Sequence, residues 1–120
     1  ALEINEEIGK VPKLKSKRVY NTFKIGLTTE DEILKTRILN RINKRLRQGM
    51  LTEAKKLHDN GLSFPRMESL GLESKYSSYY LQKKITKQEF IEQLSAETFK
   101  FAKRQKTWFK RDAEINWITI

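Results

Sequence analysis

Residues 86–111 read TKQEFIEQLSAETFKFAKRQKTWFKR, and this stretch carries the clearest structural signal in the chain. It opens with the Thr-x-x-Glu spacing of a capping box, in which threonine and glutamate side chains bond free backbone N–H groups at the start of a helix. Four apolar residues then recur on one helical face: Phe90, Leu94, Phe101 and Trp108. The stretch therefore predicts a helix of roughly 39 Å, at about 1.5 Å per residue.

A second helix is expected upstream. Thr29-Glu30-Asp31-Glu32 has the same capping-box spacing, and the helix after it should run to about Gln48, before Gly49. An apolar residue stands at every fourth position, which predicts a buried stripe made of Leu34, Ile38, Ile42 and Leu46.

Two more helices are expected between these long ones. The first covers about 51–60, with Ala54 and Leu57 facing inward. The second covers about 66–83, after a connector at 62–66 in which Pro65 disfavours a helical Phe64.

Short strands are expected near both ends of this helical region. Residues 19–27 are rich in β-branched and aromatic side chains, and residues 115–120 alternate between apolar and polar. The two strands are too far apart in sequence for a hairpin, so we expect them to be neighbours in a larger parallel sheet. The fold class is therefore α/β. Residues 1–8 are interpreted as the end of a helix and residues 10–18 as a basic loop, so the sequence opens within an element and is expected to be a truncated chain.

The composition restricts the possible functions. Among 120 residues, 25 are Lys or Arg and 15 are Asp or Glu, which gives a net charge of +10 and predicts attraction to polyanions, nucleic acid first and anionic membrane second. The absence of cysteine excludes disulfides, thiol catalysis and cysteine-based zinc sites. No apolar run approaches the roughly 18 residues that span a bilayer. The five glycines do not form a phosphate-binding loop.

The basic half of the 86–111 segment is the first candidate site. Six basic residues and no acidic one lie between Phe99 and Arg111. Such side chains could contact successive phosphates, while Thr107 and Gln105 could bond phosphates or base edges. The same run is equally consistent with a solvated face whose long side chains cover a core.

Other residues permit two interpretations each. Arg41 lies at the edge of the apolar stripe and shares a helical face with Arg37 and Lys44, where an arginine could fork onto a diphosphate. Alternatively, it is a surface or ion-paired arginine. Trp108 and Trp117 could stack on bases, although their periodic positions favour core packing.

Several stretches resemble the tRNA dimethylallyltransferase family. The most specific is Ala102-Lys103-Arg104-Gln105-Lys106-Thr107-Trp108-Phe109, which is similar to the family's Ala-Lys-Arg-Gln-x-Thr-Trp-Phe. The stretches 36–42, 49–57 and 67–71 resemble its Arg-Ile-x-x-Arg, Gly-Leu-x-x-Glu-Val-x-x-Leu and Ile-Gly-Tyr segments in the same order. Residues 1–10 resemble its Arg-Ala-Leu-Glu-Val…Thr-Gly-Lys stretch, and Trp117 its late tryptophan.

The resemblance implies an enzyme that moves a dimethylallyl group from dimethylallyl diphosphate to N6 of the adenosine 3′ of the tRNA anticodon. It implies a P-loop-like parallel-sheet fold, of which residues 1–120 would be a single C-terminal fragment. The phosphate loop, the catalytic aspartate and the Mg²⁺ site would lie upstream. A cytoplasmic, monomeric enzyme without a membrane partner is also implied.

By motif position, the resemblance assigns roles to nine residues. Arg41 would contact the diphosphate. The tRNA-binding residues would be Met67, Gly71, Glu73, Lys103, Arg104, Gln105, Thr107 and Lys110. The family's tyrosine after the glycine is Leu72 here, its next basic residue is Glu73, and an arginine is replaced by Phe99.

Two competing functions remain open at this stage. One is a stand-alone basic helical module that binds nucleic acid without catalysis. The other is a membrane-surface amphipathic helix over 86–111.

Overall fold

The computed structural model describes residues 9, 17 and 19–120. The elements predicted at 1–8 and 10–18 fall almost wholly outside these residues. Along the described chain the elements are β1 (Lys24–Thr28), α2 (Asp31–Arg47), α3 (Met50–Asp59), α4 (Phe64–Ser69), α5 (Leu72–Leu81), α6 (Lys87–Phe109) and β2 (Ile115–Thr119).

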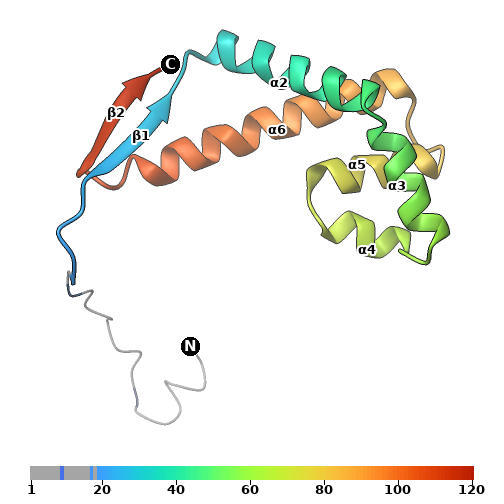
Figure 1. Cartoon of the computed structure of the whole chain (residues 1–120), viewed down its shortest axis with the longest axis horizontal. Helices are drawn as coiled ribbons and strands as arrows, with labels where there is room; N and C mark the ends of the chain where they lie inside the picture. The colour runs from blue at the N-terminus through green and yellow to red at the C-terminus, as the bar shows by residue number, and fades with distance from the viewer. Residues whose placement is uncertain (1–8, 10–16, 18) are drawn as a thin grey trace.

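Helices α2 and α6 are the two longest elements, and the rest of the described chain is arranged around them. They run side by side, with the strands at one end of the pair and the cluster α3–α5 at the other (Figure 1). α6 begins as predicted, because the Thr86 hydroxyl accepts from the Glu89 N–H and the Glu89 carboxylate accepts from the Thr86 N–H. Residues 102–109, the segment with the most specific family resemblance, therefore lie in the C-terminal half of a long, well-capped helix.

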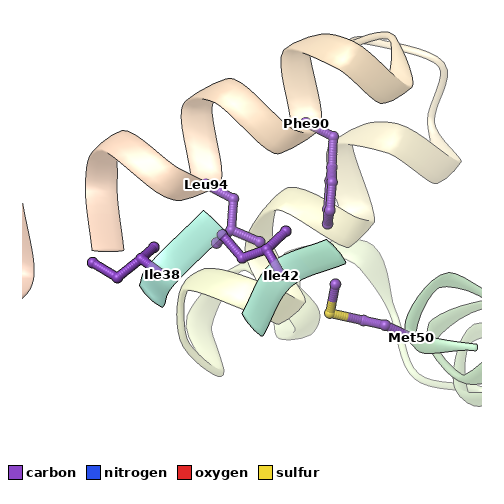
Figure 2. Close-up of a cluster of buried hydrophobic side chains, with 5 residues drawn as sticks. All are labelled: Ile38, Ile42, Met50, Phe90 and Leu94. Atoms are coloured by element: carbon purple, nitrogen blue, oxygen red, sulfur yellow. The ribbon is translucent and has the colours of Figure 1, made fainter. Parts of the chain in front are cut away.

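A compact apolar core joins the two long helices to α3. Its five buried members converge from different elements in Figure 2: Ile38, Ile42, Met50, Phe90 and Leu94. Leu34 and Leu46 pack at its edge, so the predicted stripe of α2 is confirmed. Because Phe90 and Leu94 are fully buried in protein, the first half of α6 has no apolar face left for lipid. Within the described part of the chain, no helix is long and apolar enough to cross a membrane.

Several local predictions are wrong. The Thr29 box does not form: α2 is capped at Glu30 without a side-chain bond, and the buried Thr29 hydroxyl has no partner among the described residues. Pro65 does not exclude helix at Phe64, because it occupies the first turn of α4, where a missing N–H costs nothing. The single helix expected over 66–83 is divided at Gly71, whose φ of 118° interrupts helical geometry.

Several side chains that were predicted to face the core are exposed to solvent instead. Phe101 and Trp108 share a helical face with Phe90 and Leu94, yet they are exposed, because α5 covers only the first part of α6. Leu57 is likewise exposed rather than inward. Trp117 is 37% exposed, so neither tryptophan belongs to the buried core of the described structure.

The two strands pair in parallel, as the sequence predicts, with Gly26 opposite Trp117. The first strand is shorter than expected, since residues 19–23 are exposed and only Lys24–Thr28 joins the ladder. The isoleucine and leucine side chains of β1 remain exposed, as they are in a two-stranded sheet that lacks neighbours.

Gly26 is required by the close approach of β2. A Cβ at this position would lie 2.6 Å from the Ile115 Cγ2 and 2.8 Å from the Trp117 ring. We expect Gly26→Ala to displace Trp117 and to destabilise the chain by about 1–3 kcal/mol, the usual cost of overpacking. Urea denaturation followed by tryptophan emission measures both effects. Leu27→Ala, an exposed residue of the same strand, is the matched control, and equal midpoints for the two variants would contradict the prediction.

Candidate functional site

A groove of about 570 Å³ lies between α2, the α3–α5 cluster and α6. Arg41 and Arg45 line it from α2, and Thr98 and Phe101 line it from α6. The opposite wall is the junction of α4 and α5, with Met67, Gly71 and Glu73. Four of the nine predicted site residues, from two separate parts of the sequence, therefore meet in one hollow.

Two of these four residues owe their positions to local structure. Met67 is only 1% exposed and anchors α4, so its side chain supports the groove floor rather than its surface. Gly71 turns the chain from α4 into α5 with its positive φ, a conformation that favours glycine. The turn brings Glu73, in the first turn of α5, against α2.

The two arginines of the groove differ in their partners. Arg45 Nη2 lies 3.0 Å from Glu73 Oε2, in an ion pair that joins α2 to α5 across the groove. Arg41 stands one helical turn earlier, is exposed, and makes no ion pair with the described residues. A guanidinium that lines a hollow without a carboxylate partner can bind an anion with two parallel hydrogen bonds. Arg41 therefore suits a diphosphate or a phosphate.

The remaining predicted residues lie on the second half of α6 and do not enter this groove. Lys103 and Gln105 line another cleft, of about 750 Å³, between the strands and the long helices. Arg37 borders that same cleft, whereas Arg41, one turn later on the same face of α2, lines the groove. Arg104, Thr107 and Lys110 are exposed on α6 or just after it.

Each polar residue of this half-helix has a distinct environment. Lys103 Nζ lies 2.8 Å from Asp31 Oδ2, which ties α6 to the start of α2. The Thr107 hydroxyl donates to the Lys103 carbonyl at 3.0 Å, so its proton is used within the helix. The Arg104 guanidinium lies over the Phe101 ring, 5.8 Å from its centroid. Arg104 and Lys110 therefore remain available to phosphates, whereas Lys103 is already engaged.

The Asp31–Lys103 pair gives stability a predictable pH dependence. The hydrogen bond from Lys103 holds the pKa of Asp31 below its ordinary value of 3.8, and the charges of Lys103, Lys106 and Lys35 act in the same direction. A lowered folded-state pKa contributes stability that is present above 3.8 and lost as the pH falls through the folded value. We expect Asp31→Asn to lower the urea midpoint at neutral pH and to match the wild type in acid.

Glu32→Gln is the control for this comparison. Glu32 lies in the same helical turn but pairs with Lys35, at 2.7 Å and three residues away on its own helix. Its loss does not disconnect α6 from α2. A larger midpoint change for Glu32→Gln than for Asp31→Asn would contradict a stabilising link between α2 and α6 through Asp31 and Lys103.

Sequence reasoning missed Arg45 and Asp31. Arg45 had a signal, since it follows Arg41 by four residues on the same face. Its partner Glu73 is 28 residues away, and Asp31 is 72 residues from Lys103, so neither pair has a local pattern. In the described residues, no group of three or more His, Asp or Glu side chains is placed to hold a metal ion. The upstream location of the Mg²⁺ site stays a prediction.

Several known proteins resemble this chain in sequence and in structure. The family model described as IPP transferase matches residues 1–112. The tRNA dimethylallyltransferase 2 of Treponema denticola is 44% identical over 99 residues, covering 78% of this chain and 33% of that protein. The tRNA dimethylallyltransferase of Syntrophomonas wolfei is 34% identical over 125 residues, covering 100% of this chain and 40% of that protein.

Two solved structures of tRNA isopentenylpyrophosphate transferases also resemble this chain. The full-length tRNA isopentenylpyrophosphate transferase of Bacillus halodurans superposes with a TM-score of 0.80 at 33% identity, covering 98% of this chain and 36% of that one. The corresponding transferase of Staphylococcus epidermidis gives 0.73 at 28% identity, covering 83% and 32%. The chain thus spans about a third of the length of these relatives. Since the family model matches nearly the whole sequence, the chain belongs to the IPP transferase family.

Proposed function

We propose that this chain is the tRNA-holding part of a tRNA dimethylallyltransferase. The complete enzyme would transfer a dimethylallyl group from dimethylallyl diphosphate to N6 of the adenosine 3′ of the anticodon, in the cytoplasm. The observation that carries the proposal is the groove, where Arg41 faces the Gly71 and Glu73 segment across one hollow. Both substrates must meet for transfer to occur, and this groove combines an anion-binding arginine with a segment proposed to touch tRNA.

The chemistry assigns a role to Arg41. N6 of the adenosine forms a bond to C1 of the dimethylallyl group, the C1–O bond to diphosphate breaks, and N6 gives up one proton. Negative charge accumulates on the departing diphosphate. A guanidinium held beside the departing diphosphate stabilises this charge as it develops in the transition state. Such electrostatic stabilisation is usually the largest single contribution to catalysis.

The exposed charges of α6 would hold the RNA backbone beside the groove. Arg104 and Lys110 are accessible, and the chain has a net charge of +10. Phosphate contacts of this kind position an RNA without reading its sequence, and they weaken steeply with salt. Selection of the target adenosine would then rest on the groove, into which the base must be flipped.

Binding of a labelled anticodon stem-loop to the 120-residue chain, across a salt series, tests the proposal. We expect tighter binding than to a scrambled hairpin of equal length. Arg104→Ala should lower the salt slope by about one, the change for one lost phosphate contact. Lys103→Ala should leave the slope nearly unchanged, because its amino group is engaged by Asp31. Equal binding of both hairpins would contradict recognition by this chain.

A further inference from the structure

One strip of α6 lies outside the buried core and reaches the groove at one end, through Phe101. Along the second half of α6, aromatic and arginine residues alternate at intervals of three, four and three: Phe101, Arg104, Trp108 and Arg111. These intervals keep all four on one strip of the helix and of the turn that continues it. At about 1.5 Å per residue, the two rings are roughly 10 Å apart along the axis.

Each ring of the strip has an arginine beside it. The Arg104 guanidinium carbon lies 5.8 Å from the Phe101 centroid, and that of Arg111 lies 5.0 Å from the Trp108 centroid. Phe101 is 48% exposed and Trp108 is 64% exposed. A tryptophan this accessible presents a large apolar surface that a ligand can cover.

The charge around the strip favours a polyanion as that ligand. The acidic neighbour Glu97 is held by Lys100 at 2.8 Å, and this bond lowers the pKa of the Glu97 carboxyl. The two arginines are not paired with any described carboxylate. A flat ring flanked by a guanidinium matches a nucleotide, because bases stack on aromatic faces and arginines bind the adjoining phosphates.

We propose that Phe101 and Trp108 form a stacking platform for unpaired RNA bases, with Arg104 and Arg111 on the intervening phosphates. Phe101 also borders the groove, so the platform would guide a single strand toward Arg41. The inference rests on the proposed function and adds to it a surface that takes unpaired nucleotides. It is distinct from recognition of the target adenosine, since stacking tolerates any base.

Tryptophan emission can test the platform directly. The chain has two tryptophans, so Trp117→Phe leaves Trp108 as the single reporter. A short single-stranded oligoadenylate should quench this emission, whereas a fully paired RNA duplex with the same number of phosphates should not. Trp108→Leu should weaken single-strand binding about tenfold, as expected for one lost stack, with an unchanged salt slope. Trp108→Phe should retain most of the affinity.

Other outcomes would overturn the inference. Equal quenching by the duplex would indicate charge attraction alone. An unchanged affinity of Trp108→Leu, with circular dichroism confirming its fold, would exclude stacking. A change in emission that depends on protein concentration without RNA would assign the strip to contact between copies. Failure of the proposed function is separate: the stem-loop and scrambled hairpins would then bind equally, while both still quenched Trp108.

Discussion

Replacing Arg41 by alanine in the complete enzyme is expected to slow prenyl transfer by about 30- to 150-fold. Charge-assisted hydrogen bonds contribute about 2–3 kcal/mol, and each 1.4 kcal/mol is about a factor of ten. The loss should appear in kcat/KM for dimethylallyl diphosphate, because the guanidinium is proposed to touch that substrate and its leaving group. Binding of the tRNA stem-loop should change little.

Arg47→Ala is the matched control for this experiment. It removes the same charge from the same helix, and Arg47 is exposed but lines neither the groove nor the larger cleft. Steady-state transfer of labelled dimethylallyl to tRNA measures both variants. If Arg41→Ala weakened tRNA binding and left the use of diphosphate intact, Arg41 would belong to the RNA surface. Equal losses of transfer rate in the two variants would mean that Arg41 contributes only its positive charge, and not a specific contact with the diphosphate.

The elements that sequence predicted well are those determined by local pattern. The capping box at Thr86 and the four-residue stripe of α2 each depend on residues within a few positions of one another, so α6 and the buried face of α2 were predicted. The box at Thr29 has the same spacing and fails. The chain leaves β1 only two residues before α2 begins, and the cap falls on Glu30.

The candidate site depends instead on contacts that no local pattern encodes. Arg41 and the Gly71–Glu73 segment were singled out separately, but their meeting in one groove requires the packing of α3–α5 against α2. The exposure of Trp108 was mispredicted for a related reason. Its helical phase matches that of buried Phe90, but α5 does not extend far enough along α6 to cover it.

The departures from the family pattern find partners in this structure. The resemblance leads one to expect a basic residue at position 73, where Glu73 instead binds Arg45 across the groove. It leads one to expect an arginine at position 99, where the Phe99 ring lies 5.3 Å from Lys35 Nζ. In both cases a positive charge remains nearby, on α2 rather than on α5 or α6. At both positions the partner is therefore a cation of α2, the helix that carries Arg41.

Phe90→Ala is expected to destabilise the chain by about 3–5 kcal/mol, the usual cost of removing a buried aromatic ring. Phe90 is 0% exposed, meets the Tyr80 ring edge-on at 6.3 Å, and belongs to the core that joins α6 to α2 (Figure 2). A domain of this size is stable by only about 5–15 kcal/mol, so the loss takes a large share of the total. Urea denaturation followed by circular dichroism measures it.

Phe101→Ala makes the same chemical change eleven residues later on the same helical face. Because Phe101 is exposed, its loss should cost less than about 1 kcal/mol. The pair therefore separates two roles along one helix. Phe90→Ala should impair RNA binding only by unfolding the chain, whereas Phe101→Ala should weaken it in a folded protein. Similar urea midpoints for the two variants would mean that α6 does not pass from a buried half to an exposed, RNA-facing half.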